Sequence, residues 1–215
     1  MSISPTTYYR KFLRWAGVDR AISYAIWGKV WQLFAGPITI LMIARYLSPE
    51  NQGFYYTFIS LVALQSFVEL GFSVIIVQFA SHEWSDLTLD SKGNIIGDPK
   101  AMSRLVSLGR LVFKWHLITA MAFVLTVGIG GFWFLSHETN IGLSWQSPWI
   151  AYIILSSLEL IVHPMMALLE GCNQVANTYL IRLVQSVAKS LIIWLVLFLG
   201  GDLWIAVGVA AINLL

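Results

Sequence analysis

The amino-acid sequence predicts an all-α integral membrane protein with about five full transmembrane helices and a shorter sixth. Hydrophobic residues make up 58% of the chain and charged residues only 11%, and the mean hydropathy is +0.74. Soluble domains are about a quarter charged, so this chain cannot cover itself with polar surface. Its apolar runs also recur at about the 20 residues that a helix needs to cross a bilayer.

Six such runs are bounded by polar residues, glycine or proline. They fall at about residues 22–47, 53–80, 108–135, 149–171, 177–199 and 203–215. The first five can each span a bilayer. The sixth has about 13 residues, or about 20 Å at 1.5 Å per residue, which is too short to cross. We therefore expect residues 21–215 to form one helical lobe whose sixth helix is incomplete.

Two segments lie outside these runs. Residues 1–20 mix basic and aromatic side chains without a secretory signal, which predicts an amphipathic segment lying among membrane lipids at the cytoplasmic interface. Residues 83–102 form a polar loop. Its Lys92-Gly93-Asn94 turn lies between short alternating segments and predicts a small hairpin.

The basic residues predict the orientation, because Lys and Arg concentrate in cytoplasmic loops. The loops at 48–52, 136–147 and 200–202 contain neither. The amino terminus is therefore expected on the cytoplasmic side, where the chain carries Arg10, Lys11, Arg14, Arg20, Lys92, Lys100, Arg104 and Arg110.

The composition argues against several kinds of partner. A net charge of +2, scattered along the chain, does not favour nucleic acid. The single cysteine, Cys172, excludes an intramolecular disulfide and suggests no cysteine-based metal site. We expect no cofactor and no metal.

The fourth run carries the clearest polar stripe. Glu159 and His163 are four residues apart and share a helical face with Tyr152, Ser156 and Glu170. A charged group at mid-bilayer costs about 3 kcal/mol on insertion scales, so these side chains should face a protein interior or a hydrated cavity. The pattern fits a proton relay or gate, and it equally fits an interhelical polar contact.

The fifth run has a cationic stripe. Arg182, Gln185 and Lys189 follow at i, i+3 and i+7, with Ser186 and Ser190 beside them. Such a stripe could line a cavity for an anionic head group such as a pyrophosphate. Arg182 could instead serve only as an anchor at the cytoplasmic surface.

Two earlier runs add polar groups. Lys29 and Gln32 share a face of the first run, and Gln65 and Glu69 lie on one side of the second. Lys29 is within reach of the cytoplasmic surface, so its side chain could extend to that surface and have no role in a site. Glu69 is expected to face a cavity and either to titrate or to pair with a cation such as Lys189.

At the cytoplasmic end of the third run, Arg110 and Lys114 form a stripe with Ser103 and Ser107. The stripe could guide phosphates towards a cavity or could bind the anionic inner leaflet. His116 points elsewhere and is expected to be structural.

Two stretches resemble a known superfamily. ARYLSPENQGFYYTFISLVALQSFVELGFSVIIVQFASH (44–82) and LLEGCNQVANTYLIRLVQ (168–185) are similar to the first loop and second helix, and to the turn between helices four and five, of polysaccharide flippases in the multidrug, oligosaccharidyl-lipid and polysaccharide exporter superfamily. The matching positions are Arg45, Leu47, Pro49, Glu50, Gly53, Glu69 and Gly71.

The resemblance implies two pseudo-symmetric lobes that open alternately to the two sides of the bacterial inner membrane. It implies the transfer of an undecaprenyl-pyrophosphate-linked oligosaccharide from the cytoplasmic to the periplasmic leaflet, in polysaccharide or O-antigen synthesis. The chain would supply the amino-terminal lobe, and the second lobe would follow in a longer chain or come from another one.

Other functions remain compatible with the sequence. A drug or metabolite antiporter of the same superfamily would use Glu69 and Glu159 to bind cations, and a noncatalytic assembly subunit would move nothing. A membrane enzyme is disfavoured because the sequence has no Asp-x-Asp, Gly-x-Ser-x-Gly or glycine-rich phosphate loop.

Overall fold

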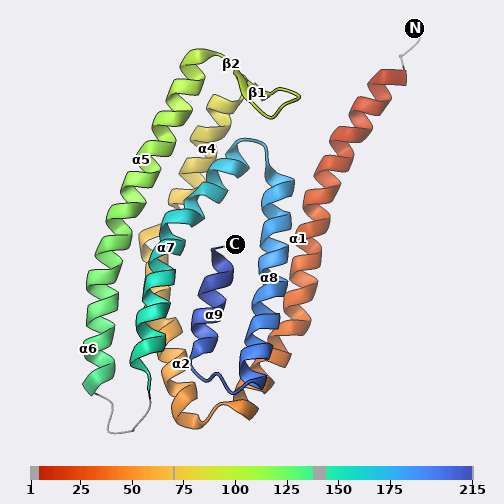
Figure 1. Ribbon diagram of the computed structural model, residues 1–215. Helices are drawn as coiled ribbons and strands as arrows, with labels where there is room; N and C mark the ends of the chain where they lie inside the picture. The colour runs from red at the N-terminus through yellow and green to blue at the C-terminus, as the bar shows by residue number, and fades with distance from the viewer. Residues whose placement is uncertain (1–4, 70, 138–143, 215) are drawn as a thin grey trace.

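The computed structural model describes residues 5–69, 71–137 and 144–214, and most of them are helical (Figure 1). The expected outer loop at 136–147 and residues 1–4 of the expected interfacial segment lie partly or wholly outside that part. The helices are α1 (Pro5–Tyr46), α2 (Pro49–Val62), α3 (Ser66–Glu69), α4 (Phe72–Trp84), α5 (Pro99–Phe123), α6 (Ile129–His137), α7 (Gln146–Gly171), α8 (Val175–Phe198) and α9 (Trp204–Asn213). Shorter elements are the 3-10 turn η1 (Ala63–Gln65), the π-helical turn η2 (Val124–Gly128) and strands β1 (Leu87–Leu89) and β2 (Ile95–Gly97).

Four of the described helices are long and apolar enough to cross a membrane. They cover Arg20–Tyr46, Pro99–His137, Gln146–Gly171 and Val175–Phe198. The prediction of an all-α chain with several helices of membrane-spanning length is therefore confirmed in its coarse form. The helix α1 continues from Pro5 into the first apolar run without a break, and the interfacial position of residues 1–20 stays a prediction.

The expected second span, residues 53–80, is not one uninterrupted helix. The chain passes through α2, η1 and α3, and α4 then begins after Gly71. Gly71 has a φ of 79°, a left-handed conformation that glycine adopts without the steric cost of a Cβ atom. The backbone turns at this glycine, which divides the run into two parts: α2, η1 and α3 before it and α4 after it.

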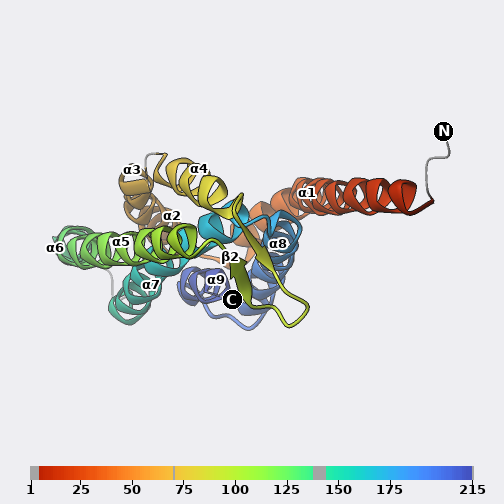
Figure 2. The same cartoon turned by 90° about the horizontal axis from the view of Figure 1, so that it is seen from above.

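The helices form two groups joined by α9. In Figures 1 and 2, α1 lies beside α8, while α4, α5 and α7 pack together on the other side. The helix α9 contacts both α7 and α8 and also reaches α2. The largest cluster of buried side chains, which includes Phe58, Trp149 and Ile205, lies between α2, α7 and α9. Figure 2 shows the beginning of α1 projecting away from the other helices.

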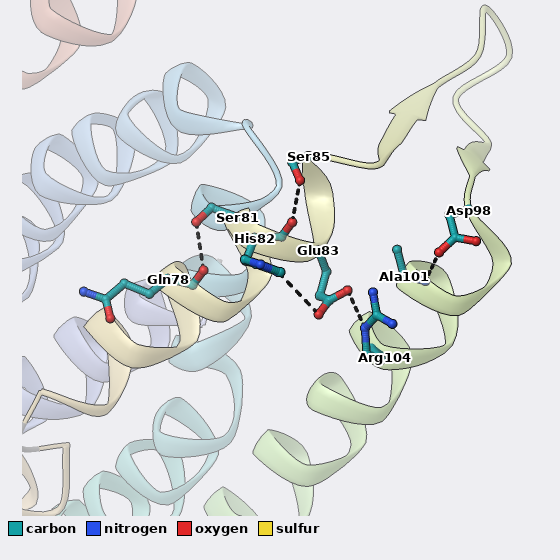
Figure 3. A network of polar contacts seen from close by, with 8 residues as sticks. All are labelled: Gln78, Ser81, His82, Glu83, Ser85, Asp98, Ala101 and Arg104. Carbon is teal, nitrogen blue, oxygen red and sulfur yellow. Dashed lines mark hydrogen bonds and ion pairs between the residues drawn. The ribbon is translucent and has the colours of Figure 1, made fainter.

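One end of the bundle carries the predicted hairpin. Strands β1 and β2 pair antiparallel, with Thr88 opposite Ile96, so the predicted hairpin is confirmed. Figure 3 shows how the flanking helices are joined: the Arg104 Nε atom of α5 donates to Glu83 Oε2 of α4 at 2.7 Å. The Asp98 carboxylate caps α5 by accepting from the Ala101 amide at 3.1 Å, and Pro99 opens the helix.

Candidate functional site

A polar pocket of about 440 Å³ lies between α7 and α8, with single side chains from α1 and α9. Its position follows from the fold, because α7 and α8 diverge from the turn that joins them and α9 lies between the parts of these helices that are remote from that turn (Figure 1). The lining residues are Gln32, Glu159, Val162, His163, Met166, Arg182, Gln185, Ser186, Lys189, Ser190 and Asn213. Six of the side chains that the sequence predicted for a site are therefore brought together here.

Two charged groups of this polar pocket lie deep along their helices. Glu159 is 13 residues from the start of α7 and 12 from its end. Lys189 is 14 residues from the start of α8 and nine from its end, or about 13 Å from the nearer end at 1.5 Å per residue. Both helices have membrane-spanning length. The two charges would consequently sit inside the hydrocarbon layer, where such groups are expensive and usually functional.

Lys189 has a free ammonium group to offer. Among the described residues it forms no ion pair within 4.0 Å. The Glu159 side chain lines the same pocket. An anionic group entering the pocket would therefore meet the Lys189 ammonium, which has no ion-pair partner among the described residues. It would compete with the Glu159 carboxylate for that ammonium.

Arg182 is already paired. Its Nη2 atom donates to Glu170 Oε2 at 3.0 Å, and its guanidinium lies 5.3 Å from the centre of the Tyr179 ring. This ion pair bridges the end of α7 and the beginning of α8. The expected cationic stripe therefore has carboxylates beside its cations, because Glu170 pairs with Arg182 and Glu159 lines the same pocket as Lys189.

His163 contacts an acidic side chain of another helix. Its Nδ1 atom lies 3.7 Å from Oε1 of Glu69, and the contact is an ion pair when the imidazole is protonated. Glu69 was expected to titrate or to pair with a cation such as Lys189. The stripe with Glu159 and His163 was expected to form a proton relay or gate, or an interhelical polar contact. Glu69 closes α3 just before the Gly71 turn, so the broken second run is connected to the polar pocket through His163.

Hydrogen bonds between α1 and α8 form the wall of the pocket on that side. Gln32 Nε2 donates to Ser186 Oγ at 3.3 Å, and Trp31 Nε1 donates to Ser190 Oγ at 3.1 Å. From α9, the backbone carbonyl of Asn213 accepts from Gln185 Nε2 at 3.2 Å. These contacts hold three helices, α1, α8 and α9, around one polar volume.

Other predicted residues lie elsewhere. Lys29 is exposed on α1 and does not line the pocket. Arg110 and Lys114 are exposed on α5, which belongs to the other helix group. Gln65 is half-buried in η1, and its Oε1 atom has no hydrogen-bond partner among the described residues. These four side chains do not join the six that line the pocket.

Sequence patterns missed Asn213 and Trp31. Asn213 has the only amide side chain in the last apolar run, and a lone polar residue in such a run could have indicated a site residue. Trp31 precedes Gln32 in an apolar stretch, and nothing in the spacing distinguished its indole as a donor to α8. His116 behaves as expected, since it is buried and its Nδ1 atom lies 2.8 Å from the Val112 carbonyl oxygen.

Comparisons with protein-family models, with curated proteins and with solved structures found no match for this chain.

Proposed function

We propose that this chain is a flippase lobe that carries an undecaprenyl-pyrophosphate-linked oligosaccharide across the bacterial inner membrane. The observation that carries the proposal is Lys189, a cation near the middle of a membrane-length helix, in a pocket of about 440 Å³ and without an ion-pair partner among the described residues. A diphosphate is the kind of group that such an ammonium binds as a point charge. The resemblance of residues 44–82 and 168–185 to polysaccharide flippases supports the same substrate class.

Transport of this kind needs no covalent chemistry. The cargo has only to bind two conformations differently, with the pocket opening first to one side and then to the other. The second lobe implied by the resemblance would supply the facing half of the route. In this proposal the amino terminus is cytoplasmic, and the second apolar run also crosses the membrane as a broken helix, which gives five crossings before α9.

The acids of the site favour a second candidate, a cation-coupled antiporter of the same superfamily. Glu159 lines the pocket, and Glu69 reaches it through His163. Two carboxylates in a low-dielectric region could bind an organic cation or exchange a proton for cargo. Under this alternative Lys189 would compete with the cargo for Glu159, so its removal would strengthen cargo binding.

Reconstituted vesicles test the proposal and separate the two candidates. The chain is placed in proteoliposomes with an undecaprenyl-pyrophosphate-linked sugar that bears a fluorophore, and transfer is read as protection of the fluorophore from an impermeant quencher. We expect the protein to raise the transfer rate above that of empty vesicles. Lys189→Gln should lower it about tenfold, the effect of losing one charge-assisted contact of about 1.4 kcal/mol.

Lys29→Gln is the matched control, because it removes an exposed lysine that does not line the pocket. It should leave the rate unchanged, and Lys189→Arg should retain part of it. Undiminished transfer in well-folded Lys189→Gln would remove Lys189 from the site. Stronger binding of a cationic dye by Lys189→Gln, together with no transfer of the lipid-linked sugar by the wild type, would support the antiporter instead.

A further inference from the structure

A second depression lies on another face of the α1–α8 pair. This apolar groove has a volume of about 710 Å³. Its lining residues are Trp27, Val30, Trp31, Phe34, Leu183, Val184, Val187, Ala188 and Leu191. All of them are hydrophobic, and several are largely exposed, with Trp27 at 64%, Phe34 at 65% and Val184 at 58%.

The apolar groove adjoins the polar pocket through one side chain. The Trp31 ring lines the groove, while its Nε1 atom donates to Ser190 Oγ, which lines the pocket. Helix α8 contributes alternate faces to the two volumes, with Leu183 and Val187 on the groove side and Arg182 and Lys189 on the pocket side. The apolar groove and the polar pocket thus lie on two sides of one helix pair.

We propose that the apolar groove binds the polyprenyl chain of the lipid-linked cargo, and that this docked position precedes transfer of the head group into the polar pocket. The inference deepens the proposed function and rests on it. The groove extends along α8 from Leu183 to Leu191, about 12 Å at 1.5 Å per residue. Its volume of about 710 Å³ leaves room for the methyl branch that an isoprenoid chain carries on every unit.

Aromatic surface and charge support the same occupant. Trp27, Trp31 and Phe34 present rings whose faces pack against the branched, unsaturated units of a polyprenyl chain. Arg20 precedes Trp27 by seven residues, so it lies on the same face of α1, about 10 Å nearer the hairpin end. It is exposed. A phosphate attached to a chain in the groove would meet this guanidinium, which suits phosphate geometry.

Photolabelling in nanodiscs of phosphatidylcholine tests the docking site. The probe is undecaprenyl phosphate with a diazirine in its hydrocarbon chain, and cross-links are mapped by mass spectrometry. We expect labels within Trp27–Phe34 of α1 and Leu183–Leu191 of α8. Unlabelled undecaprenyl phosphate should displace the probe, and dioleoyl phosphatidic acid, which carries its phosphate on two unbranched chains, should not displace it at equal concentration.

Two pairs of variants make the test specific. Val184→Trp places an indole in the groove and should lower labelling about tenfold, the effect of losing roughly two buried methylene groups. Leu195→Trp is its control, because Leu195 is 53% exposed on the same helix and does not line the groove. Arg20→Gln should weaken binding of the probe, whereas Arg110→Gln, which alters an exposed arginine of α5, should leave it unchanged.

Several outcomes would overturn the inference. Equal displacement by phosphatidic acid would make the groove a site for any bilayer lipid, and full labelling of Val184→Trp would place the probe elsewhere. In Val184→Cys with Cys172→Ser, a disulfide-linked dimer that excludes the probe would show that a second copy of the chain fills the groove.

The labelling experiment tests the docking site and the transfer experiment tests the proposed function, so one can fail without the other. Lys189→Gln should keep full labelling while transfer falls about tenfold, because Lys189 belongs to the polar pocket. Groove labelling by a wild-type chain that transfers nothing would support the docking site and contradict the proposed function. Full transfer together with full labelling in Val184→Trp would remove the docking site and leave the function.

Discussion

The His163 imidazole of α7 lies 3.7 Å from the Glu69 carboxylate, which closes α3 at the interruption of the second apolar run. The contact joins the irregular part of the bundle to the polar pocket. Helical spacing alone puts His163 beside Glu159, four residues earlier on the same helix. In the folded chain the acid within 4 Å of His163 is instead Glu69 of α3.

A double-mutant cycle should detect this pair. Because both side chains are partly exposed, at 45% and 30%, we expect Glu69→Gln and His163→Gln to be coupled by up to about 1 kcal/mol when the imidazole is protonated. The measurement is unfolding of the purified chain in mixed detergent micelles. Glu159→Gln with His163→Gln is the control and should be additive within about 0.5 kcal/mol. Coupling to Glu159 in place of Glu69 would contradict the observed pairing.

Close packing of α7 on α4 makes Gly171 sensitive to substitution. A Cβ atom at this position would lie 2.5 Å from the Ala80 Cβ and 2.9 Å from the Val77 carbonyl oxygen. Backbone atoms cannot move aside alone, so Gly171→Ala should destabilise the protein by about 1–3 kcal/mol. Gly53→Ala is the matched control, since no atom lies within 4 Å of the added Cβ. Equal unfolding midpoints for Gly171→Ala and the wild type would contradict the close approach.

The hairpin turn should respond to acid. The Asp90 carboxylate accepts from the Lys92 amide at 2.7 Å and from the Asn94 amide at 2.8 Å. These hydrogen bonds, with Asn94 contributing most, hold the pKa of Asp90 below its usual value of 3.8. A lowered pKa stabilises the turn above that value, and the stabilisation is lost as the pH falls through the lowered pKa.

Asp90→Asn reproduces the loss of this charge at neutral pH. We expect faster amide hydrogen exchange at Lys92 and Asn94 in the variant, measured by mass spectrometry of the hairpin peptide. Asp86→Asn is the control, because no hydrogen bond to its side chain is found among the described residues. Unchanged exchange in Asp90→Asn would show that the two amides are held without the carboxylate.

The proposed orientation has a direct test. In a Cys172→Ser background, Ser91→Cys places a thiol in the hairpin turn and Asp202→Cys places one in the turn between α8 and α9. An impermeant maleimide added to intact spheroplasts should label Asp202→Cys at once and Ser91→Cys only after lysis. The reverse pattern would place the hairpin and the amino terminus outside.

Much of the fold could be predicted because lipid imposes simple rules on a sequence. Backbone groups in hydrocarbon must bond internally, so apolar runs of about 20 residues become helices. The bounds of α7 and α8 lie within three residues of the runs at 149–171 and 177–199. The stripe of Arg182, Gln185 and Lys189, which the sequence places on one helical face, also lines one pocket.

Contacts between distant segments could not be predicted in the same way. Residues 53–80 are uniformly apolar enough to suggest one helix, and only the structure shows the left-handed turn at Gly71. Likewise, Lys29, Arg110 and Lys114 resemble pocket cations in sequence, yet they are exposed and do not line the pocket.

By itself, the sequence determined that the chain is helical and apolar and which faces of its helices carry polar groups, because both properties arise from residues within four positions of one another. Tertiary structure alone decided that Glu69 meets His163, that Glu170 neutralises Arg182 and that Lys189 is left without a direct ion-pair partner among the described residues. Those outcomes depend on how whole helices pack, and helix packing is a sum of many small contacts that no local pattern encodes.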